Sequence, residues 1–191
     1  HLYKNIPEIF NYMLENKLIG RKGAGGFYKL EIVDGRKIKK SIDLSTKEYS
    51  ESIKPKIESL KLVKKNLSGF LELNENYSKY AWAVLSDVIL YTLNHTSDIS
   101  TDIVSVDSAM KNGFGLQFGP FELLDKLGKT WIKEKLSMES FSIPLLLENL
   151  PEEKFYKVDD GKLKFFNFTK GILENLERPN GVLILSDIKK S

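Results

Sequence analysis

The amino-acid sequence predicts a mainly α-helical chain with two small β-hairpins. Three observations support this fold class. Apolar residues recur at helical spacing over most of residues 57–150, prolines stand where several helices would begin, and Asp-Gly twice separates strand-like runs, at 34–35 and 160–161. The chain has 191 residues, 41% hydrophobic and 29% charged, which is typical of one globular domain or two small ones.

The first expected element is a helix that begins near Pro7. A proline fits the first turn because the N–H that it lacks would have no partner there. The glycine-rich stretch 20–26 ends the helix. The residues that share its apolar face are Ile6, Ile9, Phe10, Met13 and Leu14.

A hairpin is expected next. The strand-like runs 27–33 and 37–42 flank Asp34-Gly35. Two-residue hairpin turns need positive φ angles, which glycine adopts without strain. The sequence therefore predicts two antiparallel strands that meet at this dipeptide.

After Pro55 the pattern is helical almost to Asn112, with a weak break near 73–76. Residues 80–93 are strongly apolar and are expected to be buried. The segment 101–111 is amphipathic. The apolar residues of the central segment are Trp82, Val84, Leu85, Val88, Ile89 and Leu90.

A glycine-rich turn at 113–119 precedes a helix over 120–127, which Pro120 begins and Gly128 ends. Shorter helices are expected at 131–136 and 143–150. The tail then repeats the head, because a proline-started helix, a Phe-Tyr-Lys strand and an Asp-Gly hairpin occur in the same order in both. This order predicts a tandem duplication whose first copy lacks its front half, so that the chain begins inside a domain.

Composition argues against several functions. The formal net charge is +3, but the basic residues are almost all lysine and are interleaved with 26 acidic ones along most of the chain, whereas nucleic-acid recognition favours arginine. The chain has no cysteine and two histidines, so it offers no metal-ligand spacing. It also has no apolar run long enough for a membrane helix. Nucleic acid and membranes are therefore not expected partners, and a cytoplasmic location is expected.

The two glycine-rich loops are not expected to bind nucleotides. The loop at 20–26 precedes a strand and the loop at 113–119 lies between helices, whereas phosphate-binding loops precede a helix. His95 is expected near the end of a helix, where a histidine more often caps carbonyl groups than performs chemistry. No catalytic, cofactor-binding or metal-binding residue is predicted in this chain.

One cluster remains as a candidate site. It surrounds the turn at 113–119 and is interpreted first as core or interface and second as a wall for an acyl chain. Its members are Phe114, Phe118, Gly119, Pro120 and Phe121.

Two adjoining motifs, at 103–115 and 119–128, resemble the C-terminal helical domain of 3-hydroxyacyl-CoA dehydrogenases. They read Ile-Val-Ser-Val-Asp-Ser-Ala-Met-Lys-Asn-Gly-Phe-Gly and Gly-Pro-Phe-Glu-Leu-Leu-Asp-Lys-Leu-Gly. The loop 20–28 resembles the end of the same domain, with Ala24 in place of the family's middle glycine. The resemblance implies a helical bundle of that type. It also implies a long bacterial fatty-acid oxidation enzyme with two helical copies, the second degenerate.

The resemblance also implies the domain boundaries. Residues 1–30 would end the first helical domain, 31–56 would form a hairpin and linker, 57–150 the second helical domain, and 151–191 a hairpin and linker toward a following domain. The family's catalytic His–Glu pair lies in an NAD-binding domain. Its substrate-contacting asparagine falls here on Trp82 or Ala83, and neither is an amide.

The expected function is therefore that of a non-catalytic fragment of an NAD-dependent 3-hydroxyacyl-CoA dehydrogenase of β-oxidation. It would serve domain packing, dimerisation and closure over acyl-CoA. The fragment itself would bind no cofactor, and NAD would belong to the parent enzyme. Its expected partners are the other domains of the polypeptide and the parent's acyl-CoA substrate, and a homo-oligomer is left open. The alternative is a stand-alone helical module that binds acyl chains or proteins.

Overall fold

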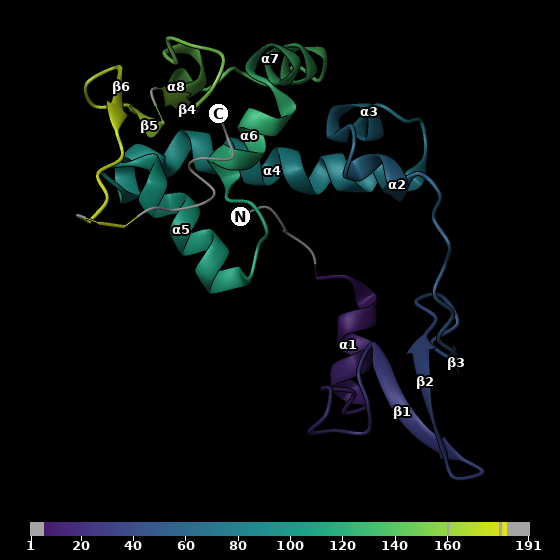
Figure 1. The fold of residues 1–191 in the computed structure, drawn as a ribbon. Coiled ribbons are helices and arrows are strands. Elements are labelled where there is room, and N and C mark those ends of the chain that lie inside the picture. Colours follow the sequence, from purple (N-terminus) through teal and green to yellow (C-terminus); the bar gives the residue numbers. More distant parts are fainter. Residues whose placement is uncertain (1–5, 160, 180, 183–191) are drawn as a thin grey trace. The chain divides into compact units, whose positions relative to one another are not determined.

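The computed structural model describes residues 6–159, 161–179 and 181–182. The chain divides into two compact units, unit 1 (residues 1–57) and unit 2 (residues 58–191), and each is described by itself (Figure 1). Helices make up most of the regular structure, and two small antiparallel sheets accompany them. The predicted mainly α-helical fold class is confirmed.

The described residues of unit 1 form one helix and a three-stranded antiparallel sheet of order β1-β2-β3. The predicted hairpin is confirmed, because Val33 pairs with Arg36 across a turn of two residues. Both turn residues have positive φ, 51° at Asp34 and 74° at Gly35, as a turn that follows the twist of the strands requires. The short third strand was not predicted. The elements of unit 1 are α1 (Glu8–Glu15), β1 (Tyr28–Val33), β2 (Arg36–Ile42) and β3 (Tyr49–Glu51).

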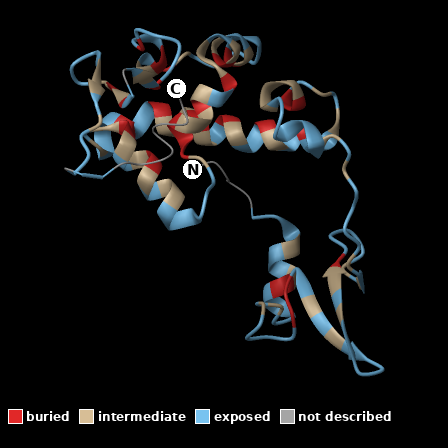
Figure 2. Ribbon diagram, viewed as in Figure 1, coloured by how far each residue is buried: buried red, intermediate tan, exposed pale blue. Residues whose placement is uncertain are grey.

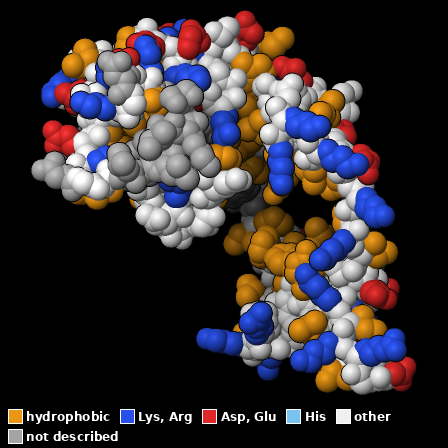
Figure 3. Space-filling view, in the orientation of Figure 1, with side chains coloured by type: hydrophobic (Ala, Val, Ile, Leu, Met, Phe, Trp, Pro, Cys, Tyr) orange, Lys and Arg blue, Asp and Glu red, His pale blue; other side chains and the backbone are white. Residues whose placement is uncertain are grey.

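Unit 1 covers little of its own apolar surface. Met13 and Ile42 are its buried hydrophobic side chains among the described residues. Large apolar side chains along α1 and β1 are exposed instead, and Figure 3 shows them interleaved with lysine and arginine. The exposed residues include Ile6, Phe10, Leu14, Phe27, Tyr28, Leu30 and Ile32.

Unit 2 begins with helices and ends with a second three-stranded antiparallel sheet, of order β4-β5-β6. Its helices are α2 (Leu60–Val63), α3 (Leu67–Leu71), α4 (Asn76–Ile99), α5 (Ile103–Phe114), α6 (Pro120–Leu127), α7 (Lys129–Met138) and α8 (Leu145–Glu148). Its strands are β4 (Tyr156–Asp159), β5 (Lys162–Asn167) and β6 (Ile172–Asn175).

The helical stretch expected after Pro55 is divided at points that side-chain caps explain. The Asn66 side chain accepts a hydrogen bond from the N–H of Gly69 at the start of α3. The Asp102 side chain does the same for the N–H of Ser105 at the start of α5. The predicted break near 73–76 is present between α3 and α4.

The core of unit 2 lies where α4, α6 and the C-terminal elements meet, and Figure 2 shows the buried residues gathered there. The Phe155 ring makes edge contacts with Phe121 at 4.9 Å and with Phe166 at 6.2 Å. The Trp82 ring meets the Trp131 ring edge-on at 5.5 Å. The Phe121–Phe155 contact joins α6 to the start of the second sheet, and the Trp82–Trp131 contact joins α4 to α7.

Helix α4 is buried on one face only. The expectation that all of residues 80–93 are buried is therefore wrong for the other face, where Tyr80 is 73%, Val84 46% and Tyr91 64% exposed. The buried face carries Trp82, Ile89 and Leu93. Within unit 2, the neighbouring helices cover a single side of this long helix.

The predicted internal repeat is visible in the backbone. Both sheets have the same antiparallel order, and Asp159 pairs with Lys162 across a two-residue turn, as Val33 does with Arg36. Asp160 lies outside the described residues. The next turn also repeats. Asp43 Oδ1 accepts the N–H groups of residues 45 and 46, and Asn167 Oδ1 accepts those of residues 169 and 170.

Candidate functional site

A buried carboxylate joins three elements of unit 2. Asp107 lies one helical turn after Ile103 on the buried face of α5, and its side chain is 2% exposed. Its carboxylate accepts the N–H of Phe121 at 2.8 Å and the N–H of Glu122 at 3.1 Å. It also accepts the hydroxyl of Tyr156 at 3.0 Å. Asp107 therefore ties α5 to the start of α6 and to β4.

The start of α6 is built around this carboxylate. The first N–H groups of a helix have no partner within the helix, and Asp107 supplies one from outside. Gly119 is required beside it, because a Cβ at this position would overlap the Asp107 carboxyl group. Glu122 completes the cap, since its side chain accepts the Gly119 N–H at 3.0 Å and pairs with Lys111 Nζ at 2.9 Å.

A second carboxylate holds the start of the sheet. The Asp125 side chain accepts the N–H of Phe155 at 2.6 Å and the N–H of Tyr156 at 2.8 Å. These amides lie at the beginning of β4, thirty residues further along the chain. Asp125 therefore fixes the position of the strand whose tyrosine reaches Asp107.

Burial dominates the electrostatics of this cluster. It raises the pKa of Asp107 to about 6, against the opposing hydrogen bonds from Phe121 N–H and the Tyr156 hydroxyl. Burial likewise raises the pKa of Asp125 to about 6, against the Phe155 and Tyr156 amides. The pKa of Tyr156 lies far above its usual range because of burial and the adjacent Asp107. Since all three groups are engaged with one another or with backbone, the cluster is suited to holding structure and not to transferring protons.

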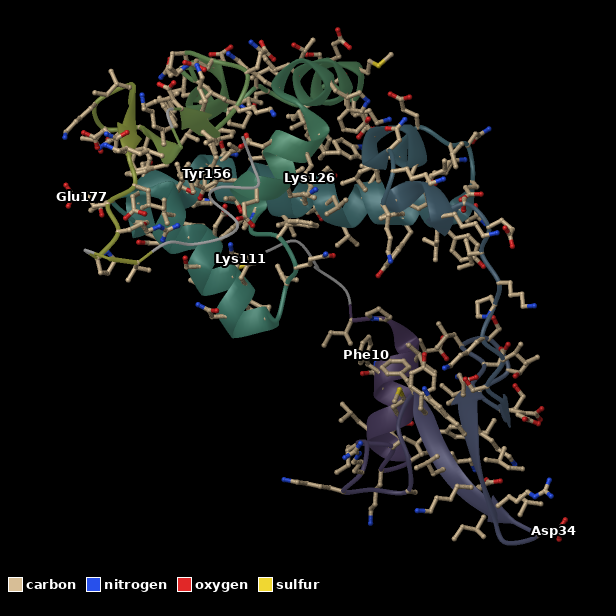
Figure 4. The ribbon with its side chains drawn as sticks, in the orientation of Figure 1. Phe10, Asp34, Lys111, Lys126, Tyr156 and Glu177 are labelled. Atoms are coloured by element: carbon tan, nitrogen blue, oxygen red, sulfur yellow. The ribbon has the colours of Figure 1, made fainter. Side chains whose placement is uncertain are left out.

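A cavity of about 830 Å³ lies beside the cluster, and α5, α6, β4 and the segment after β6 line it. Figure 4 labels Lys111, Lys126 and Tyr156, which reach it from α5, α6 and β4. Phe118 contributes part of its apolar wall, and the Lys126 ammonium lies 4.2 Å from the centre of the Phe118 ring. The wall is thus mixed, with basic and apolar side chains side by side.

The five residues of the predicted aromatic cluster are in different environments. Phe118 lines the cavity. Phe121 is fully buried in the core, Gly119 and Pro120 are buried at the start of α6, and Phe114 is 75% exposed. Their role as an interface or acyl-chain wall stays a prediction.

The other positions considered from sequence have structural partners. Trp82 Nε1 donates to Glu139 Oε1 at 2.6 Å, and Ala83 is exposed. His95 Nδ1 lies 3.4 Å from Asp98 Oδ2 near the end of α4. His1 lies outside the described residues.

Within the described ranges, no three histidine or acidic side chains are grouped as metal ligands. The helices described in both units are too short or too polar to span a bilayer.

Sequence reasoning missed the importance of Asp107 and Asp125, to which it assigned no functional role. One signal for Asp107 was available. It stands one turn after Ile103 and three residues before Met110, so it lies along the apolar side of an amphipathic helix. A carboxylate in that position needs donors from elsewhere in the fold.

Comparison with known proteins places this cluster in a family context. Residues 84–163 match the family model for the C-terminal domain of 3-hydroxyacyl-CoA dehydrogenase. That range contains α5, α6 and Tyr156 and thus the whole Asp107 cluster. No solved structure matches the chain.

Longer proteins are similar to most of the chain. A Rickettsia felis protein with the provisional name of a fatty acid oxidation complex trifunctional enzyme is 32% identical over 174 residues, which cover 91% of this chain and 23% of that protein. A Bacillus subtilis protein provisionally named a 3-hydroxyacyl-CoA dehydrogenase is 30% identical over 171 residues, or 85% of this chain and 21% of that protein. The chain therefore spans less than a quarter of the length of these relatives.

Proposed function

We propose that this chain, whose residues 84–163 match the model for the C-terminal domain of 3-hydroxyacyl-CoA dehydrogenase, is a non-catalytic packing segment of a fatty-acid oxidation enzyme. In this proposal the parent enzyme is an NAD-dependent dehydrogenase of 3-hydroxyacyl-CoA. The segment packs against another helical domain of the same type and helps to close it over acyl-CoA. The residues that transfer the hydride and the proton belong to other domains.

One contrast between the two units carries the proposal. In unit 2, Phe155 is 1% and Tyr156 9% exposed, and two aspartates hold their backbone and hydroxyl groups. In unit 1, the matching Phe27 is 40% and Tyr28 57% exposed. The Phe-Tyr-Lys sequence precedes a corresponding hairpin in each unit. Its aromatic side chains are buried by neighbouring helices in unit 2 and exposed in unit 1.

Unit 2 indicates what kind of domain would bury the exposed Phe27 and Tyr28 of unit 1. A helical domain like unit 2 would supply an aspartate from each of two helices and an apolar surface for the phenylalanine. Unit 2 of the same chain cannot play this part with its own pair, because Phe155 and Tyr156 already occupy Asp107 and Asp125. The partner is therefore a second domain of this type.

Charge favours the same partner. Residues 1–57 carry twelve basic and seven acidic side chains, whereas residues 58–191 carry seventeen basic and nineteen acidic ones. A domain with the composition of unit 2 is thus weakly acidic and complements the basic unit 1. Complementary charge speeds association and disfavours wrong partners.

The non-catalytic part of the proposal is supported by the site. The two buried carboxylates of the described cluster already accept hydrogen bonds from backbone amides and from the Tyr156 hydroxyl group. A general base needs a free lone pair directed toward a substrate proton. NADH-linked reduction of acetoacetyl-CoA by the purified chain should therefore not exceed the rate without protein. Turnover that survives contaminant controls would contradict the proposal.

Sedimentation velocity tests the packing part. Without its partner, the uncovered face of β1 should make the chain self-associate as its concentration rises. The double variant Tyr28→Glu/Leu30→Glu should remain monomeric. Val33→Glu is the matched control, because Val33 lies on the opposite face of the same strand and should leave self-association unchanged. A monomeric wild-type chain would favour the alternative function, a stand-alone helical module.

A further inference from the structure

We propose that the cavity between α5, α6 and β4 binds a small anionic amphiphile, with a carboxylate or phosphate head and an apolar tail. The inference goes beyond the packing function and does not depend on it. The cavity volume of about 830 Å³ lies in the range of natural small-molecule sites. Among the described residues, five cationic side chains line it, namely Lys111, Lys126, Lys154, Lys157 and Arg178.

The carboxylates in the wall are already engaged. Asp107 and Asp125 accept the backbone amides and the hydroxyl group described above. Glu122 pairs with Lys111 and caps α6. Their oxygens are therefore turned to the protein, although their charges still weaken the field in the cavity.

Two of the four lysines in the wall form ion pairs with described residues and two do not, although the charge of Lys154 acts on Asp125 by lowering its pKa. Lys111 pairs with Glu122, and Lys157 pairs with Glu152 at 2.9 Å. In the described part of the chain, neither Lys126 nor Lys154 has a carboxylate oxygen within 4.0 Å of its ammonium group. The Lys126 ammonium rests over the Phe118 ring, and its N–H groups that face away from the ring can donate to a ligand. Lys126 and Lys154 are the residues expected to bind the anionic head.

The apolar part of the ligand follows from the rest of the wall. Phe118, Val158, Leu163 and Leu176 line the same cavity and come from four different segments. A simple inorganic anion would leave this surface in contact with water. A ligand with a short hydrocarbon tail would bury it, and each buried methylene contributes about 0.8 kcal/mol at most.

Isothermal titration calorimetry with the full chain tests the site. The probes are octyl phosphate and octanoate, which separate the two head groups, with inorganic phosphate as head alone and octanol as tail alone. We expect saturable binding of at least one amphiphile, and weaker binding of phosphate and of octanol. The amphiphile that binds tighter identifies the head. Equal binding of octanol, or no saturable binding of either amphiphile, would overturn the proposal.

Variants connect binding to the two lysines. Lys126→Ala/Lys154→Ala should weaken binding of the preferred amphiphile about tenfold or more, because each charge-assisted contact is lost. The matched control is Lys79→Ala/Lys162→Ala, which removes two exposed lysines of unit 2 outside the cavity wall and should leave the affinity unchanged. Thermal unfolding verifies that both variants fold. Equal affinity of the two double variants would overturn the assignment. A negative result here leaves the sedimentation test of the packing function unaffected.

Discussion

The hydroxyl group of Tyr156 donates to the carboxylate of Asp107 over 3.0 Å, although 49 residues separate the two in sequence. This bond closes a loop that contains α6, α7 and α8. Asp107 accepts two backbone amides of α6 at the same time. One buried side chain thus determines how a helix, a helix start and a strand meet.

Removing this carboxylate should be costly. Asp107→Ala leaves the Phe121 and Glu122 amides and the Tyr156 hydroxyl without their acceptor, so we expect a loss of about 2–4 kcal/mol in the free energy of unfolding. Urea denaturation followed by circular dichroism measures it. Asp98→Ala, on the exposed end of α4, is the control and should change stability by less than about 0.5 kcal/mol. A small loss for Asp107→Ala would contradict the central position of this residue.

The paired tyrosines of the two repeats should respond differently to the same change. Tyr156→Phe removes the hydroxyl from Asp107 and should cost about 1–2 kcal/mol. Tyr28→Phe alters an exposed side chain and should be neutral within about 0.5 kcal/mol. Thermal unfolding of the two variants in the same buffer gives the comparison. Equal losses of unfolding free energy in the two variants would contradict the different environments of Tyr28 and Tyr156.

Substitutions at two glycines should have opposite effects on stability, because one glycine is needed for close packing and the other only lowers helix propensity. Gly119→Ala places a Cβ on the Asp107 carboxyl group and should destabilise the chain by about 2 kcal/mol or more. Gly113→Ala lies within α5 with open space around it and should stabilise by about 0.5–1 kcal/mol. Denaturant midpoints would show opposite shifts. Shifts of the same sign would refute the close approach at Gly119.

The two buried aspartates should make stability depend on pH. Their pKa is about 6 in the folded chain against an ordinary value of 3.8, so the folded state binds their protons more tightly than the unfolded state. This contribution to stability is fully present below about pH 4 and is lost as the pH rises through 6.

We expect each carboxyl group to account for a fall of about 1–3 kcal/mol in unfolding free energy between pH 4 and pH 7. Carboxylates whose pKa is lowered by an ion pair, such as Glu174 beside Lys170, act in the opposite direction. The informative quantity is therefore the difference between wild type and Asp107→Asn or Asp125→Asn across this range. A difference that does not vary with pH would argue against the raised pKa values.

The parts of the fold that local chemistry determines could be predicted from sequence. The Asp34-Gly35 turn needs only its two residues, and Pro120 and Gly128 mark the ends of α6 within one residue. What could not be predicted depends on distant segments. Asp125 is an ordinary helix residue in sequence, and its partners lie thirty residues away. The exposed face of α4 carries Tyr80, Val84 and Tyr91 among its polar residues, so a count of apolar residues overestimates how much of the helix is buried.

The Asp107–Asp125 cluster should also affect how the backbone of unit 2 opens to solvent. The amides of residues 121, 122, 155 and 156 all donate to these two side chains, so none of them can meet solvent while the carboxylates stay in place. Their hydrogen–deuterium exchange should therefore slow together and share one opening rate, although two of them belong to helix α6 and two lie at the start of strand β4. Helix α6 and strand β4 would then open as a single cooperative unit.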